Sequence, residues 1–135
     1  MKEKTNIRAY LSLSHSDIMF VERNKIKLIN FFKIKKIKKF KFSTTRVDSG
    51  IELFDTGCIE SLETASVINE VLKCLKSNFN NDFEEFLVFN EIKLVRVNVI
   101  INIHEGYSPS LHLNRKIINE LFLSNIEIDF DIYTY

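Results

Sequence analysis

Three carboxylates alternate with apolar residues near the end of the chain, in the run from Ile126 to Tyr133. Glu127, Asp129 and Asp131 share one face of a strand there, because successive side chains of a strand point to opposite faces. Paired carboxylates can bind a divalent metal ion, although neighbours about 7 Å apart suit a bridging arrangement better than a compact cage. The acidic face could instead mimic phosphate and contact a basic protein surface. A solvated face that pairs with lysines of the next strand is the favoured interpretation.

A second candidate is the lysine-rich segment from Lys25 to Phe42, in which apolar residues are interleaved with the lysines. Its part from Lys33 to Lys41 could bind phosphate, an acidic protein or a membrane surface. It could also be an edge strand or ribbon whose lysines prevent sheet-to-sheet aggregation, and this interpretation is favoured. The candidate partner-binding residues come from this segment, from the first turn of a predicted helix and from the acidic run: Lys35, Lys36, Lys38, Lys39, Glu84, Glu85, Glu127, Asp129 and Asp131.

The histidines and serines do not form a recognisable catalytic or metal-binding pattern. His15, His104 and His112 fall in separate predicted elements, and none has the helical spacing of a zinc-ligand pair. Ser14 and Ser16 flank His15, but adjacency in sequence does not supply the geometry of a catalytic triad. We therefore expect no catalytic residue, no metal site and no cofactor, and the chain is not expected to be an enzyme.

The composition predicts one folded domain that spans residues 1–135 and works in the cytoplasm. The chain is 45% hydrophobic and 27% charged, which is ordinary for a globular protein. Its formal net charge of +1 gives no strong overall field for nucleic acid or a membrane. No run resembles a signal peptide or a membrane span. Cys58 and Cys74 are far apart in the sequence, so we expect reduced thiols.

Hydrophobic periodicity supplies the elements that must position these candidates. Strands are expected where apolar residues recur at every second position, at residues 6–14, 44–54, 91–104 and 126–133. Helices are expected where they recur at helical spacing, at residues 61–77, 83–89 and 114–124, with weaker helical signals at 18–24 and 26–33. The remainder of 25–42 is open between helix and strand.

This order of elements predicts an α+β fold. We expect a single antiparallel or mixed twisted sheet of about four to five strands, with the helices packed mainly on one face. The last strand is expected inside the sheet, because an unpaired strand at a chain terminus would fray. In the last helix, the residues expected to face the core are Ile117, Ile118, Leu121 and Phe122.

Three stretches of the chain resemble a known bacterial family. They are the opening Arg8-Ala-Tyr-Leu-Ser-Leu-Ser, the middle Asp48-Ser-Gly-Ile before the helix Ser61 to Leu75, and the ending from Ser108-Pro-Ser-Leu-His-Leu to Ile128-Asp-Phe-Asp-Ile-Tyr133. Together they resemble the domain of unknown function 4279 family, whose members close with a proline–leucine turn, a helix and an Asp-X-Asp-X-Tyr strand. Where that family usually has a tryptophan in its middle strand, this chain has Gly50 or Ile51.

The resemblance implies a function as an immunity protein of a polymorphic or contact-dependent growth inhibition toxin system. Such a protein would bind the C-terminal domain of its cognate toxin, often a nuclease, and block its active site. The expected partner is that toxin domain, with no membrane and no direct nucleic acid, and the homo-oligomeric state is left open. The alternative is a nucleic-acid-binding or regulatory module that uses the basic ribbon Lys33–Lys41.

Overall fold

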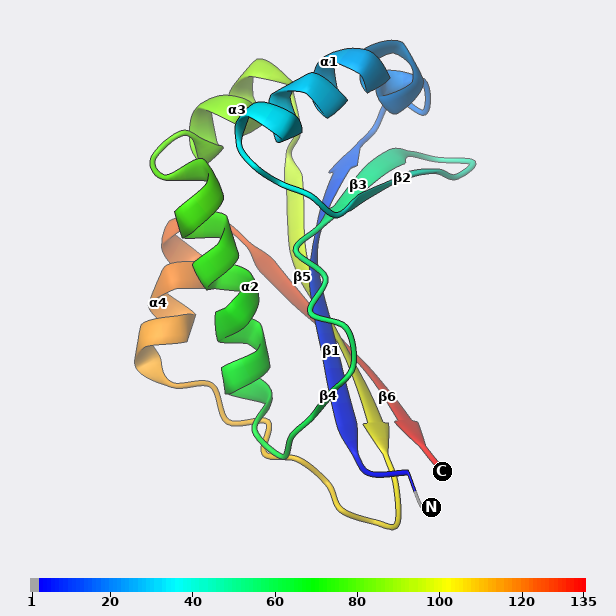
Figure 1. Cartoon of the computed structure of the whole chain (residues 1–135), viewed down its shortest axis with the longest axis vertical. Helices are drawn as coiled ribbons and strands as arrows, with labels where there is room; N and C mark the ends of the chain where they lie inside the picture. The colour runs from blue at the N-terminus through cyan, green and yellow to red at the C-terminus, as the bar shows by residue number, and fades with distance from the viewer. Residues whose placement is uncertain (1–2) are drawn as a thin grey trace.

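The computed structural model describes residues 3–135, and it confirms the predicted α+β class (Figure 1). Helices and strands alternate irregularly along the chain. In order they are β1 (Asn6–His15), α1 (Phe20–Ile34), β2 (Phe40–Thr44), β3 (Ser49–Leu53), β4 (Ile59–Glu60), α2 (Thr64–Phe79), α3 (Phe83–Phe89), β5 (Leu94–Ile103), α4 (Arg115–Leu123) and β6 (Glu127–Thr134).

These strands form one mixed sheet in the order β2-β3-β1-β5-β6. The two-residue strand β4 pairs with the start of β1, on the edge that β3 occupies farther along. All pairs are antiparallel except β5 and β6, which run parallel and are joined through α4. A parallel pair needs such a crossover connection, because a tight turn cannot return the chain to the same end of the sheet.

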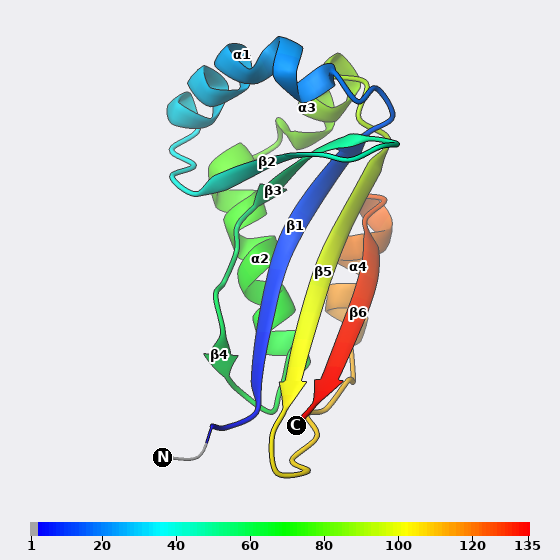
Figure 2. The ribbon, with the colours of Figure 1, turned by 90° about the vertical axis from the view of Figure 1, so that its right-hand side faces the viewer.

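The helices leave one face of the sheet bare. α2 and α4 lie along one face (Figure 1), and the view onto the opposite face shows the strands with no helix in front of them (Figure 2). On the covered face Leu11 and Val97 are directly opposed, and both are completely buried. The next pair along, Ala9 and Val99, is buried as well. Strict alternation of buried and half-buried residues in β1 and β5 follows, because each strand has only one covered face.

Phenylalanine side chains fill the end of the core where α1 and α3 meet. Phe32 of α1 is completely buried and lies 5.1 Å from Phe40 and 6.0 Å from Phe86, measured between ring centroids. Phe31 stacks on Phe86 at 4.9 Å, which joins α1 to α3 directly. Each phenylalanine ring packed at such a distance removes a large apolar area from water. This cluster therefore fixes the upper helices to the sheet.

The strand predicted at residues 44–54 is confirmed in its second half, where β3 buries Ser49, Ile51 and Leu53 on one face, and is wrong in its first half, where a hairpin turn lies. β2 and β3 pair across a turn in which the Thr45 N–H donates to the Asp48 carbonyl at 2.8 Å. The Thr45 hydroxyl also donates to an Asp48 carboxylate oxygen at 2.6 Å. Alternation through residues 44–54 would place Val47 on the same face as Ile51 and Leu53, but Val47 is 76% exposed. Short polar side chains that bond to their own backbone favour such turns, and this chemistry overrides the apparent alternation through Val47.

The lysine-rich segment is part helix and part strand. α1 is one continuous helix from Phe20 to Ile34, where hydrophobic periodicity predicts two short helices. Its buried residues, among them Val21, Leu28 and Phe32, fall on one side at helical spacing. The chain then leaves the helix and enters β2 at Phe40, so the part of this segment that was open between helix and strand ends as a strand.

The C-terminal unit differs from its prediction in two respects. β6 is an edge strand of the sheet rather than an interior one, because it pairs with β5 and with no second strand of the described chain. In α4 only Ile117 and Leu121 are buried, whereas Ile118 is 51% and Phe122 is 80% exposed. Both differences have one cause: nothing in residues 3–135 covers the outer side of β6 and α4.

The phenylalanine cluster yields a stability test. Replacing Phe32 by alanine removes a completely buried ring and leaves a cavity, so we expect a loss of about 3–5 kcal/mol in the free energy of unfolding. Phe89 on α3 is 86% exposed, and Phe89→Ala should change stability by less than about 0.5 kcal/mol. Urea denaturation of the two variants measures the difference, and equal effects would contradict the described core.

Candidate protein-binding site

The bare face of the sheet, which is turned toward the viewer in Figure 2, is lined by half-buried polar side chains. We call this surface the open face and define it by residues of β1 and β5. Because the covered face takes the odd positions of both strands, their even positions form the open face. The polar members are Asn6, Arg8, Tyr10, Ser12, Ser14, Arg96, Asn98 and Asn102.

Hydrogen bonds between strands hold several of these side chains in place. The Asn98 amide donates to the Ser12 hydroxyl at 2.8 Å. The Asn102 amide donates to the Asn6 side-chain oxygen at 3.0 Å, across a directly opposed pair of β1 and β5. Cross-strand polar pairs of this kind stabilise the sheet locally and restrict rotamers. The open face therefore presents polar groups in fixed positions.

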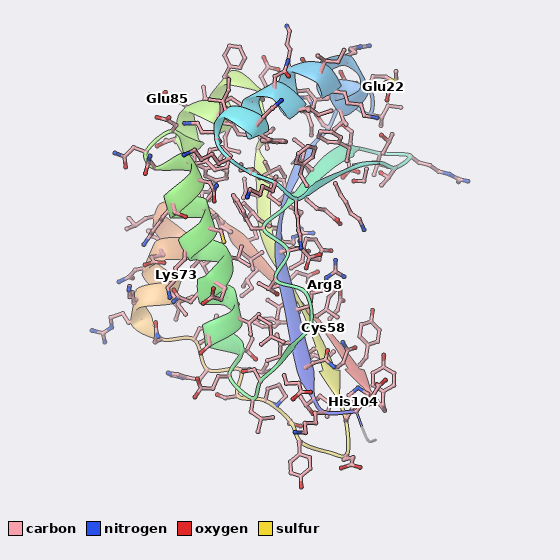
Figure 3. The ribbon with its side chains drawn as sticks, in the orientation of Figure 1. Arg8, Glu22, Cys58, Lys73, Glu85 and His104 are labelled. Atoms are coloured by element: carbon pink, nitrogen blue, oxygen red, sulfur yellow. The ribbon has the colours of Figure 1, made fainter. Side chains whose placement is uncertain are left out.

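An arginine–carboxylate pair lies at one side of the open face. Arg8 Nε donates to both Asp55 carboxylate oxygens, at 2.9 and 3.0 Å, and the guanidinium lies 5.1 Å from the centroid of the Tyr10 ring. In Figure 3 Arg8 extends from β1 away from α2, on the side of the sheet that no helix covers. The fork geometry of guanidinium and carboxylate makes such a pair directional.

The loop after β3 brings Asp55 to this position. The Ala9 N–H donates to the Thr56 hydroxyl at 3.0 Å, and the Thr56 N–H donates to the Ala9 carbonyl at 2.9 Å. Gly57 has a φ of 67°, a conformation that glycine adopts without strain, and its N–H donates to Asp55 at 2.9 Å. These bonds fix the loop to β1, so Asp55 is positioned before Arg8 approaches it.

Ionisation on the open face is altered by these contacts. The hydrogen bond from Arg8 lowers the pKa of Asp55 and is the main cause of its shift, with the Gly57 N–H contributing in the same direction. The same hydrogen bond raises the pKa of Arg8. Burial raises the pKa of Tyr10, and the negative charges of Glu52 and Asp131 add to this increase. Near neutral pH the surface thus carries a fixed ion pair beside a neutral phenol.

The predicted acidic run forms the border of the open face. Glu127, Asp129 and Asp131 lie beside Arg96, Asn98 and Ile100 respectively in the register of β5 and β6. We call these three carboxylates the acidic edge. Glu127 is engaged, because Arg96 Nη2 donates to it at 3.1 Å. Within residues 3–135 no hydrogen bond or ion pair holds Asp129 or Asp131, so two exposed carboxylates remain available to a partner.

The other predicted glutamates lie at the opposite end of the molecule. Glu84 and Glu85 line a cleft of about 1240 Å³ between α1 and α3, together with Lys27 and Phe89. Figure 3 shows Glu85 on α3, far from Arg8 and from the open face. Lys35 also lines this cleft and forms an ion pair with Asp82. Cationic and anionic residues face one another here, so the cleft has no uniform charge.

Three further predicted lysines lie around a smaller hollow. Lys36, Lys38 and Lys39 line a space of about 340 Å³ beside the loop after β3, and Asp55 and Glu70 line it as well. Lys41 follows on β2, an edge strand of the sheet, as the lysine-protected edge predicts. The nine predicted partner-binding residues therefore occupy three separate places, of which the acidic edge borders the open face along β6.

Sequence reasoning missed the Arg8–Asp55 pair and Tyr10. The alternation of residues 6–14 places Arg8 and Tyr10 on the wet face, so that part of the signal was present. No sequence signal connects Asp55 to Arg8, because the loop that carries it is placed by backbone hydrogen bonds to Ala9.

The remaining titratable residues are dispersed. His15 stacks on Phe20, with ring centroids 4.2 Å apart, and its Nδ1 accepts the Asp17 N–H at 2.9 Å. His104 stacks on Tyr135 at 4.7 Å, at the other end of the sheet. Among the described residues, no three histidine, cysteine or acidic side chains form a group that could hold a metal ion. Both cysteines are free thiols.

None of the helices in residues 3–135 has both the length and the apolar character needed to span a membrane.

Comparison with known proteins identifies no family. No family model matches the sequence, and no curated protein matches it. Among solved structures, the crystal structure of MupZ from Pseudomonas fluorescens is similar over 100% of this chain and 92% of that chain, with 8% sequence identity and a TM-score of 0.46. A likeness this distant carries no inference about function. The resemblance to the domain of unknown function 4279 family stays a prediction.

The Arg8–Asp55 pair predicts a measurable coupling between two distant segments. In a double-mutant cycle with Arg8→Met and Asp55→Asn, we expect a coupling energy of about 0.5–1 kcal/mol at neutral pH, since both side chains are about one-third exposed. Urea denaturation of the four proteins measures it. Additive effects would show that the pair contributes nothing to stability.

The same pair predicts a pH dependence. The pKa of Asp55 is lower in the folded state than its unfolded value of about 3.9, so between these two values the unfolded state binds more protons. The stabilisation is therefore complete above about pH 4 and is lost as the pH falls through the folded pKa. Denaturation at a series of pH values should show that the free energy of unfolding falls less steeply with acidification in Asp55→Asn than in the unmodified chain.

Proposed function

We propose that this chain is an immunity protein that binds a bacterial toxin domain, a nuclease with a basic active-site surface, through the acidic edge and the adjoining open face. One observation carries the proposal: Asp129 and Asp131 have no partner among residues 3–135 and border a surface whose polar side chains are already fixed. The family resemblance of the closing segment, which contains the same two aspartates, supports the same conclusion.

The physical basis is preorganisation. A partner that binds a surface with fixed rotamers loses less conformational entropy than one that must order flexible side chains. On the open face, hydrogen bonds between β1 and β5 hold Ser12, Asn98 and Asn102 in this way. Carboxylates at its border attract a basic surface, which speeds encounter and fixes orientation. Phosphate-binding sites of nucleases are basic, so two spaced carboxylates are suited to cover one.

The proposed mechanism is occlusion in the cytoplasm. The immunity protein covers the active site of the toxin domain, so that substrate cannot enter, and no chemical step is required of the immunity protein itself. No cofactor or metal is needed for this role. Binding strength and the accessibility of the toxin active site are therefore the quantities that decide protection.

The lysines around the smaller hollow support a second candidate, nucleic-acid binding. Lys36, Lys38 and Lys39 are exposed and close together, which would suit phosphate contacts. Asp55 and Glu70 line the same hollow and offset part of that charge. Changing Lys35, Lys36, Lys38 and Lys39 to glutamate should abolish binding to generic nucleic acid if this candidate is correct, and the unmodified chain should then bind more weakly as salt increases.

Co-expression tests the immunity proposal. The probe is the C-terminal domain of a secreted toxin encoded directly upstream of this chain, expressed in a bacterial host with and without the chain. We expect growth arrest with the domain alone and normal growth when both are present. Continued arrest in the presence of the folded chain would overturn the proposed function.

Charge reversal identifies the surface. Asp129→Lys/Asp131→Lys should weaken the complex at least about tenfold, because two attractive contacts become repulsive. The matched control is Glu84→Lys/Glu85→Lys, which changes the net charge equally on exposed residues of the distant α3 cleft. Isothermal titration with the toxin domain measures both. Loss of affinity in the control alone would place the binding surface at the cleft between α1 and α3.

A further inference from the structure

The outer edge of β6 is a long backbone edge without a strand partner in residues 3–135. β6 has eight residues and pairs with β5 in continuous register from Glu127 to Thr134. Edge strands are usually protected by charged side chains, above all lysine, or by proline, a bulge or short length. The charges that β6 carries are the three carboxylates of the acidic edge, so its protection is selective: it repels an acidic strand but not a basic one. β6 contains no lysine and no proline, and its pairing shows no bulge. By contrast, β2 at the opposite edge has five residues and carries Lys41.

Beside the outer backbone of β6, the three carboxylates of the acidic edge lie on the open face of the sheet, and part of α4 lies on the covered face. The Lys76 ammonium of α2 donates to Glu120 of α4 at 2.8 Å, so this side of α4 faces α2. Ile118 and Phe122 are each two residues from Glu120, about 200° around the helix, and therefore lie on the side away from α2. Because α4 lies behind β5 and β6 with α2 behind β1 (Figure 2), that side is next to the outer edge of β6.

Ile118 and Phe122 form what we call the apolar ledge. Phe122 is 80% and Ile118 is 51% exposed, and the two are four residues apart, so they form one uncovered apolar strip on α4. On the same side of the sheet Ile132 of β6 is half exposed. Only a molecule beside the edge can contact both the ledge and Asp129, because the ledge and the carboxylates lie on opposite faces of the sheet.

We propose that an extended segment of the protein partner adds to the sheet as a strand beside β6. Its lysine or arginine side chains lie on the open side, against Asp129 and Asp131, and its alternate residues are apolar and cover the ledge at Phe122. Backbone hydrogen bonds to β6 supply affinity, and the alternation of basic and apolar residues supplies specificity. This inference rests on the proposed function, since it names the part of the partner that the binding surface recognises.

The charges disfavour a second copy of this chain in the same place. Two β6 strands paired antiparallel about Phe130 would set Asp129 of one copy opposite Asp131 of the other, and pairing about Asp131 would set this carboxylate opposite its own copy. Directly opposed like charges destabilise a strand pair. β2 has the basic alternation, but its Phe40 and Phe42 already pack on Phe32 of α1, with centroids 5.1 and 6.5 Å away, and are not free to cover the ledge.

The test uses the full chain and a synthetic peptide in which lysine and valine alternate, with a glutamate–valine peptide as its counterpart. Amide hydrogen exchange of β6, followed by NMR, reports strand addition directly, because newly paired backbone N–H groups exchange more slowly. We expect the lysine peptide to slow exchange in Glu127–Thr134 and the glutamate peptide to have no effect. Asp129→Lys/Asp131→Lys should reverse this preference.

The apolar ledge supplies the matched pair of variants. Phe122→Ser should weaken binding of the lysine peptide about tenfold, because the apolar residues of the added strand lose their cover. Leu123→Ser is the control: Leu123 is equally exposed, at 81%, but lies about 60° from Glu120, on the side of α4 toward α2. Equal affinities of Phe122→Ser and the unmodified chain would overturn strand addition, as would peptide-induced changes confined to α3.

Two further outcomes separate the alternatives. If, without peptide, the β6 amides exchange more slowly as the protein concentration rises, the edge binds a second copy of this chain and the proposal is overturned. With the toxin domain as partner, an affinity that is the same for Phe122→Ser as for the unmodified chain would overturn strand addition while leaving the immunity function intact. If the unmodified chain fails to protect the host from the toxin domain, but the lysine peptide still slows amide exchange in β6, the immunity function is rejected and the edge is retained as a strand-binding site.

Discussion

The pairing of β1 with β5 is the constraint on which the rest of the structure depends. Nine residue pairs join the strands, from Asn6 with Asn102 to Ser14 with Leu94, and one side of this ribbon is completely buried. The strict alternation means that a shift by one residue would expose Leu11 and bury Arg8. Register therefore determines at once which side chains form the core and which form the open face.

The two faces have different energetic roles. The covered face supplies stability through apolar burial, with the phenylalanine cluster extending it toward α1 and α3. Polar pairs such as Asn98–Ser12 contribute little net stability, because they replace hydrogen bonds to water. What they provide is fixed geometry on a surface that solvent can reach. β6 belongs to neither role completely, because it is the last strand of the sheet and its covered side is only half-buried.

Sequence periodicity predicted the helices and strands whose own residues alternate clearly between apolar and polar. Val95, Val97 and Val99 identified β5, and residues 83–89 identified α3 with its bounds correct. The failures lie where non-local contacts decide. Thr45 and Asp48 turn the chain inside an apparent strand, and the exposure of Phe122 depends on what lies beside β6 rather than on the periodicity of α4. For the candidate site, the acidic edge was visible in sequence, whereas the Arg8–Asp55 pair required the loop to be placed in space.

The separation of β1 and β5 along the chain also affects how the protein acquires its fold. β1 is in the middle of the sheet, yet its long partner begins only at Leu94, after three helices and the β2–β3 hairpin have been made. A ribosome delivers β1 first, so both of its edges wait for strands that are synthesised later. Contacts between residues so distant in sequence slow folding, because a large loop must close before they form. The apolar side of β1 is therefore the segment most in need of protection in the nascent chain.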